Sequence, residues 1–238
     1  MANYIYGKNV VRQRILSNKK IHRLFFNQKH PDTSLLELAK KQAIPYELVQ
    51  ESFLNKIDLH HQGIVAEIDV YKIFDLEEVL KDLKENATFV ILDGLEDPHN
   101  LGAILRSADA SGVDAIIIPK HGSVTLNATV AKVSTGAIET VKTVMVTNLN
   151  QCIDTLKKAG FWIYASEYSE KAVLYRSVKF ANKSAIIIGS EGQGISRLVL
   201  KNADVIVKIP MLGEVNSLNA SVSAALLMYE VLAQRQPQ

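Results

Sequence analysis

The feature that most constrains the fold of this chain is a regular alternation of short apolar runs with helix-forming segments from Thr88 onward. The runs are apolar at successive positions, which is typical of parallel strands that helices cover on both faces. They predict strands near residues 88–93, 114–118, 142–146, 161–165, 185–189 and 204–209. A last helix is predicted from about residue 216 to 233. The pattern therefore indicates an α/β domain built on a parallel sheet.

Three polar loops leave the ends of three of these predicted strands. Residues 97–110 read DPHNLGAILRSADA, residues 186–196 read IIIGSEGQGIS, and residues 209–223 read IPMLGEVNSLNASVS. The carboxyl ends of parallel strands lie at one edge of a sheet, where α/β proteins place their ligands. We therefore expect the three loops to gather at one ligand site.

The third loop carries residues suited to holding a ligand through its backbone. Pro210 has no backbone donor, and Gly213 permits a tight or left-handed turn. Asn216 or Ser217 is expected to cap the last helix and to leave free N–H groups pointing into the turn. An ordinary connection between a strand and a helix explains the same residues, so the loop taken alone leaves both interpretations open.

Taken in order, the three loops resemble the three motifs of the SpoU (TrmH) family of RNA ribose 2'-O-methyltransferases, within the SPOUT superfamily. Residues 5–10 (IYGKNV) and 60–65 (HHQGIV) also resemble the N-terminal substrate-binding domain of the branch that methylates a guanosine in 23S rRNA. The resemblance covers essentially the whole chain. It implies a C-terminal SPOUT domain with a parallel sheet and a deep trefoil knot, a small N-terminal α/β (L30e-like) domain, and a homodimer.

The same resemblance implies an enzyme that transfers a methyl group from S-adenosylmethionine to a ribose 2'-hydroxyl of RNA, with a guanosine in 23S rRNA as the first candidate. A tRNA ribose 2'-O-methyltransferase and a non-catalytic RNA-binding protein are the alternatives. A silent protein would have lost a motif residue, whereas Arg106, Glu191 and residues 217–219 are present. An NAD-linked oxidoreductase needs a glycine-rich turn after the first strand of the domain, and residues 93–100 lack one.

A change of pattern divides the chain. Short extended stretches at 21–26 and 63–68 alternate with helical ones in the first part, and a more charged segment follows. The predicted helical stretches are 9–16, 34–42 and, in the charged segment, 76–83. We expect an RNA substrate-binding domain at residues 1–70, a linker at 71–86 and the SPOUT methyltransferase domain at 87–238.

Positive charge is concentrated at the start of the chain. Residues 1–30 hold seven Lys or Arg and no Asp or Glu, which leaves 20 basic against 25 acidic residues in the rest. A solvated helix face is the ordinary explanation of such a run, but its place in the expected substrate-binding domain favours contact with RNA phosphates. The expected RNA-binding residues are Arg12, Arg14, Lys19, Lys20 and Arg23.

The resemblance assigns five residues of the second and third loops to S-adenosylmethionine. Gly189, Ile209 and Leu218 would contact the cofactor through backbone groups and apolar surface. Met211 and Gly213 would shape the adenine and ribose pocket. Packing in the core is the alternative for Ile209, Met211 and Leu218.

Arg106 is expected to be central to catalysis because it matches the arginine of the first family motif. The family pattern makes this arginine the general base, but a guanidinium with a pKa above ~12 stays protonated in proteins. We therefore expect Arg106 to orient the target ribose and a phosphate and to stabilise the developing alkoxide, and the acceptor of the proton stays open. A surface salt bridge to Asp109 or Asp114 is the alternative.

Four further residues are expected to support catalysis. Asn100 would hold its loop or accept a hydrogen bond from the ribose, and Glu191 would pair with Arg106 or fix its direction. Ser217 and Asn219 would open the last helix, where they could satisfy loop carbonyls or touch the methionine end of the cofactor. Capping of the helix explains Ser217 equally well.

Other classes of site are disfavoured by the composition. Cys152 is the only cysteine, so neither an intrachain disulfide nor a cysteine cluster for zinc is expected, and we predict no metal. His99 is interpreted as a packed or solvent-facing residue, because the motif gives it no role as a base. His60 and His61 are interpreted as part of the small domain's fold or RNA surface, because adjacent histidines make poor chelates. No apolar run approaches the ~18 residues of a membrane span and the first residues are basic, so a cytoplasmic location is expected.

Overall fold

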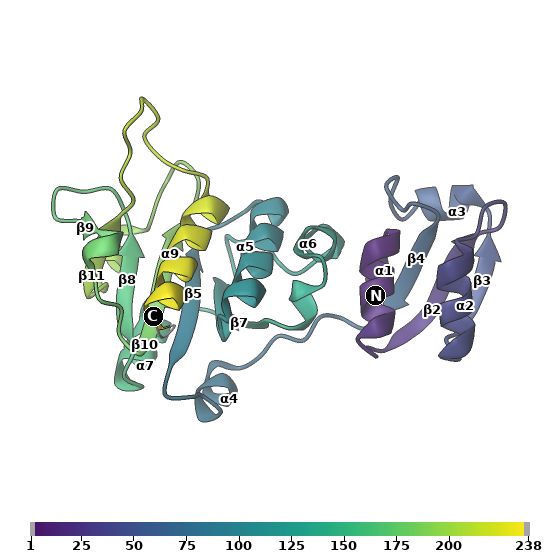
Figure 1. Cartoon of the computed structure of the whole chain (residues 1–238), viewed down its shortest axis with the longest axis horizontal. Coiled ribbons are helices and arrows are strands. Elements are labelled where there is room, and N and C mark those ends of the chain that lie inside the picture. The colour runs from purple at the N-terminus through teal and green to yellow at the C-terminus, as the bar shows by residue number, and fades with distance from the viewer. Residues whose placement is uncertain (1–2, 236–238) are drawn as a thin grey trace.

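The computed structural model describes residues 3–235, which form two separate sheets (Figure 1). The N-terminal sheet has four strands in the order β1-β4-β2-β3, and only the β2–β3 pair is parallel. Its strands are β1 (Asn3–Tyr6), β2 (Ile21–Asn27), β3 (Tyr46–Val49) and β4 (Ile64–Ile68). Its helices are α1 (Lys8–Leu16), α2 (Thr33–Lys41) and α3 (Glu51–Asn55), so the predicted stretches at 9–16 and 34–42 are helical.

The C-terminal sheet has seven strands in the order β7-β6-β5-β10-β8-β11-β9, and every pair is parallel. Its strands are β5 (Ala87–Asp93), β6 (Ala115–Pro119), β7 (Lys142–Val146), β8 (Trp162–Ser166), β9 (Val173–Leu174), β10 (Lys183–Gly189) and β11 (Val205–Lys208). The predicted parallel sheet is confirmed. The two-residue strand β9 was not predicted, because two residues show no periodicity.

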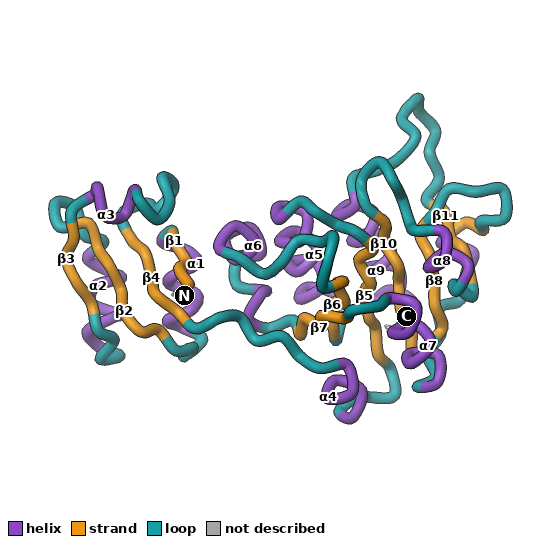
Figure 2. The backbone as a smooth tube through the Cα atoms, turned by 180° about the vertical axis from the view of Figure 1, so that it is seen from behind, coloured by secondary structure: helices purple, strands orange, loops and turns teal. Residues whose placement is uncertain are grey.

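Helices cover both faces of this sheet. They are α4 (Leu76–Lys81), α5 (Pro98–Ser111), α6 (Ala128–Ser134), α7 (Leu149–Lys158), α8 (Arg197–Lys201) and α9 (Ala220–Arg235), with short 3-10 turns at Ala137–Glu139 and Tyr175–Ser177. Helices α5 and α9 pack on one face (Figure 1), and α7 and α8 lie on the other (Figure 2). Side chains of β10 alternate accordingly, since Ile186 and Ile188 join one core cluster and Ile187 joins the other. Within residues 3–235, no helix has the length and apolar character to cross a membrane.

Local signals explain several helix ends. Asn148 accepts hydrogen bonds from the N–H groups of Asn150 and Gln151 at the start of α7. The side chain of Asp97 accepts from the N–H of His99 at the start of α5, whose first residue is a proline. These caps direct both helices away from the carboxyl edge of the sheet.

The last helix begins later than the sequence predicts. It starts at Ala220 rather than at residue 216, and neither Asn216 nor Ser217 caps it. Asn219 takes that place, because its Oδ1 accepts from the Ser221 N–H at 2.9 Å. Residues 209–219 therefore form a long loop that projects from the carboxyl edge (Figure 1).

The direction in which the chain adds strands to the sheet reverses between β5 and β10. The chain runs from β5 outward through β6 to β7, then crosses to β8 and fills the gap between β5 and β8 with β10. Ligand sites of open α/β sheets lie outside the carboxyl ends of strands at such a switch. The trefoil knot that the family resemblance implies stays a prediction.

Candidate functional site

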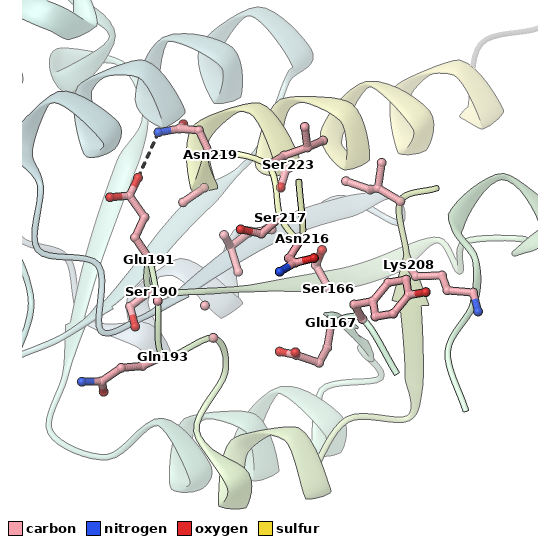
Figure 3. A pocket seen from close by; sticks show the side chains of 18 of the residues that line it. Ser166, Glu167, Ser190, Glu191, Gln193, Lys208, Asn216, Ser217, Asn219 and Ser223 are labelled. Atoms are coloured by element: carbon pink, nitrogen blue, oxygen red, sulfur yellow. Dashed lines mark hydrogen bonds between the residues drawn. The ribbon is translucent and has the colours of Figure 1, made fainter. Parts of the chain in front are cut away.

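A cavity of about 530 Å³ lies at the carboxyl edge of the C-terminal sheet (Figure 3). Its walls come from the ends of β8, β10 and β11 and from the loop that leads into α9. The lining residues are 166–168, 188–194, 208, 209, 211, 216–220 and 223. The second and third predicted loops meet here, and the first contributes through a hydrogen bond described below.

One wall of the cavity is a closely folded glycine loop. Ser190 and Gly194 exchange two backbone hydrogen bonds at 3.1 and 3.0 Å. Gly189 lies directly against this turn, since a Cβ built on it would be 2.2 Å from the carbonyl carbon of Gly194. Gly192 and Gly194 have φ values of 85° and 67°, which glycine adopts without steric cost. The glycines thus allow the chain to fold back on the end of β10 without side chains filling the space.

Glu191 links the first and third loops. Its Oε1 accepts from Asn100 Nδ2 at 2.5 Å and from Asn219 Nδ2 at 2.9 Å (Figure 3 shows the second bond). Asn100 is only 5% exposed, so this carboxylate satisfies a buried amide. The bonds connect the first turn of α5 to the start of α9, and they bring together three of the predicted catalytic residues.

The predicted pairing of Glu191 with Arg106 is not observed. Glu191 accepts from the two asparagine amides instead, and no ion pair of Arg106 is found within the described part of the chain. Arg106 is exposed on α5 and does not line the cavity. Its alternative partners are engaged elsewhere, because Asp109 accepts from the Thr140 hydroxyl and Asp114 from the Thr88 N–H. The catalytic role of Arg106 stays a prediction.

Four of the five predicted cofactor residues line the cavity, namely Gly189, Ile209, Met211 and Leu218. Gly213 does not line it, and its φ is not positive, so of the tight or left-handed turn that the sequence permits, the left-handed form is not adopted. The long loop bends over several residues, and no left-handed residue is required at position 213. Ser217 also lines the cavity.

Sequence reasoning missed one wall of the cavity. Ser166 ends β8, Glu167 and Tyr168 follow it, and Lys208 ends the neighbouring strand β11. The available signal was the position of residue 166, directly after a predicted strand of the same parallel sheet. No glycine-rich or polar motif marks this loop.

The five predicted RNA-binding residues have different surroundings. Arg14 is buried: its side chain is 8% exposed, forms an ion pair with Glu139 and donates to the Lys20 carbonyl at 3.0 and 3.2 Å. The structure therefore removes Arg14 from this set, because its guanidinium links α1 to the 3-10 turn Ala137–Glu139 instead of facing solvent. The exposed residues are Arg12, Lys19, Lys20 and Arg23, of which Arg23 pairs with Glu47 and Lys20 with Asp69 at 3.5 Å.

The histidines have no shared site. His61 is buried and binds Asn55 Oδ1 and the Gly63 N–H, whereas His60 is exposed beside Asp58. His99 is exposed beside Asp97. Across residues 3–235 there is no cluster of three or more His, Cys, Asp or Glu able to hold a metal ion.

Comparisons with known proteins match both parts of the chain. The model of the family described as SpoU rRNA Methylase family matches residues 87–229, and the model described as RNA 2'-O ribose methyltransferase substrate binding matches residues 4–74. A Staphylococcus aureus (strain MSSA476) protein, whose name places it in the TrmH family of tRNA/rRNA methyltransferases, is 49% identical over 97% of this chain and 96% of its own length. A protein of the same name from Staphylococcus haemolyticus (strain JCSC1435) is 47% identical over 97% and 95%.

Solved structures share the fold. The SpoU methyltransferase AviRb from Streptomyces viridochromogenes has a TM-score of 0.84 at 21% identity, covering 98% of this chain and 90% of that one. AviRb was also solved in complex with the cofactor AdoMet, again with a TM-score of 0.84. A crystal structure of an RNA 2'-O ribose methyltransferase has a TM-score of 0.81 at 28% identity, covering 98% and 88%. This chain therefore belongs to the SpoU rRNA methylase family and is an RNA methyltransferase.

Proposed function

We propose that this chain transfers a methyl group from S-adenosylmethionine to the 2'-hydroxyl of a ribose in RNA, with a guanosine of 23S rRNA as the first candidate target and tRNA as the second. The observation that carries the proposal is the cavity at the carboxyl edge, where loops 188–194 and 209–220 meet and Glu191 ties them to Asn100. The AdoMet complex of AviRb, a protein of the same fold, supports the choice of cofactor.

The cavity suits S-adenosylmethionine in size and chemistry. Its volume of about 530 Å³ lies within the ~300–1,000 Å³ of small-molecule sites. Ile209, Met211 and Leu218 offer apolar surface for a neutral base, and the glycine loop exposes backbone groups to the ligand. When bound, the cofactor supplies a methyl group activated by a sulfonium.

The residues of the chain position the acceptor. We assign the methyl-bearing end to the side of the cavity where Glu191, Asn219 and Ser217 lie, because Asn100 connects that side to α5 and hence to the helix that carries Arg106. Arg106 has no ion-pair partner among residues 3–235, so its fork of donors is free to hold the target ribose and a neighbouring phosphate. In this role it stabilises the negative charge that develops as the 2'-hydroxyl loses its proton.

We assign RNA affinity and target choice to residues 1–70, a connecting role to 71–86 and the chemistry to 87–238. The two family models, which match 4–74 and 87–229, support this division. The exposed cations Arg12, Lys19, Lys20 and Arg23 are the proposed phosphate contacts.

A homodimer in the cytoplasm is part of the same proposal. Helix α9 presents Val222, Leu226 and Tyr229, which are 46%, 37% and 48% exposed, on one face at helical spacing. This apolar stripe lies on a helix that packs against α5, which carries Arg106, so a second copy that covered it would approach the reaction site. Light scattering of the chain and of a Leu226→Glu variant tests the dimer.

The experiment that tests the function is transfer of labelled methyl from S-adenosylmethionine to purified 23S rRNA and tRNA, followed by mapping of 2'-O-methylation. We expect one methylated ribose in 23S rRNA and binding of the cofactor in the presence of a chelator. Methylation of tRNA alone selects the second target, and RNA binding without transfer favours a non-catalytic protein.

A paired variant tests the RNA surface. Lys19→Gln combined with Lys20→Gln should reduce the slope of log affinity against log salt by about 1.4, at ~0.7 per phosphate contact on single-stranded RNA. The matched control is Lys158→Gln with Lys179→Gln, two exposed lysines of the C-terminal part. If the two double variants had the same salt slope, Lys19 and Lys20 would not be phosphate contacts.

A further inference from the structure

Glu167 is a carboxylate in the cavity that the chain itself barely satisfies. Its backbone N–H donates to the Val207 carbonyl at 3.0 Å, which fixes the residue at the end of β8. Its Oε2 accepts one long hydrogen bond, from the Ile195 N–H at 3.4 Å. No ion pair of Glu167 is found among the residues that the structure describes. An ionised carboxylate can accept about four hydrogen bonds, so most of its capacity is free for a ligand.

The carboxylate is held against the glycine loop. A Cβ built on Gly194 would lie 3.0 Å from Glu167 Oε2, so the absence of a side chain at 194 leaves room for this oxygen. Figure 3 shows Glu167 toward the opposite side of the cavity from Glu191 and Asn219. It therefore faces a different part of any ligand that fills the space.

Lys208 lies on the strand next to Glu167, but no ion pair between the two is found among residues 3–235. Strands β8 and β11 are paired with Ser166 opposite Val207, so Lys208 is the neighbour of Glu167 at the next position. Lys208 also lines the cavity, and its Nζ lies 5.8 Å from the centre of the Tyr168 ring. Figure 3 shows the Lys208 side chain directed away from Glu167, so this lysine does not occupy the carboxylate, which stays open to a ligand.

We propose that Glu167 binds the ribose of the cofactor by accepting hydrogen bonds from its two neighbouring hydroxyls. The two carboxylate oxygens match a vicinal diol, which offers two donors side by side. Carboxylates at strand ends hold ribose hydroxyls in the same way in dinucleotide-binding folds. This inference rests on the proposed function, which places S-adenosylmethionine in the cavity.

The test is calorimetric binding of two ligands to the full chain and to Glu167→Ala and Glu167→Gln variants. S-adenosylmethionine carries the ammonium group, and 5'-methylthioadenosine lacks it but keeps the diol. Removal of a charged acceptor should weaken both ligands by the same factor, about 10- to 100-fold in the alanine variant and less in the glutamine variant. The 2'-deoxy form of methylthioadenosine should bind more weakly to the unmodified chain and lose much less on substitution.

Glu170→Ala is the matched control, because Glu170 is an exposed carboxylate of the same loop that does not line the cavity. Its affinities should equal those of the unmodified chain. A loss for S-adenosylmethionine without a loss for methylthioadenosine would identify the ammonium as the partner and overturn the proposal. Unchanged affinities in both Glu167 variants would overturn it as well. If the unmodified chain bound neither ligand, the outcome would contradict the cofactor site of the proposed function and, with it, the role of Glu167.

Discussion

Replacing Gly189 with alanine probes whether the cavity depends on the close fold of the glycine loop. The added Cβ would lie 2.2 Å from the carbonyl carbon of Gly194, 2.4 Å from its oxygen and 2.5 Å from the nitrogen of Ile195. Carbon atoms in ordinary contact are ~3.5–4.0 Å apart, so Gly194 has to retreat by more than about 1 Å. All three atoms belong to the backbone, and no side chain can rotate away to make room.

The cost follows from the contacts that this movement breaks. Gly194 exchanges two backbone hydrogen bonds with Ser190, and losing both costs about 2 kcal/mol. Overpacking adds about 1–3 kcal/mol. A domain that is stable by ~5–15 kcal/mol stays folded after such a loss, but its loop no longer frames the cavity. We expect S-adenosylmethionine to bind at least ~30-fold more weakly, which corresponds to about 2 kcal/mol.

Isothermal titration calorimetry and urea unfolding measure the two effects. The matched control is Gly213→Ala in the neighbouring loop, where an added Cβ meets nothing within 4 Å and φ is not positive. This control should change stability by no more than about 0.5 kcal/mol and leave affinity almost unchanged. If Gly189→Ala bound the cofactor as tightly as the unmodified chain, the glycine loop would not form the wall of the site.

Three further results are expected. Arg106→Ala should reduce single-turnover methyl transfer by at least ~100-fold with little change in cofactor affinity. Arg106→Lys should restore little of the transfer rate, because lysine lacks the planar fork of arginine. An active alanine variant would contradict the proposed role. Arg14→Met should lower the urea midpoint by leaving Glu139, 13% exposed, without its ion-pair partner, and adding Glu139→Leu should restore much of the loss; an unchanged midpoint in the single variant would count against the buried pair. Burial raises the pKa of the Cys152 thiol to about 12, so Ellman's reagent at pH 8 should react only after unfolding, and rapid reaction of the folded chain would contradict this.

The sequence alone determined six of the seven strands of the C-terminal sheet and the edge where the site lies. Runs such as 185–189 are apolar at every position, and such runs are stable only between two layers of helices. Caps such as Asn148 act within a few residues, so they too can be identified locally. The loops that follow the strands then had to meet at one edge, and four of the five expected cofactor residues line the cavity there.

Only the tertiary structure decided which polar groups pair. Arg14 meets Glu139 across 125 residues of chain, and Asn100 meets Glu191 across 91. A charge near the start of the chain looks the same in the sequence whether it faces RNA or a buried carboxylate. The position of Glu167 in the cavity could likewise be found only in the structure, because its place beside the glycine loop arises from the pairing of β8 with β10 and β11. Secondary structure depends on neighbouring residues, whereas the partners of charged and amide groups depend on how distant segments pack.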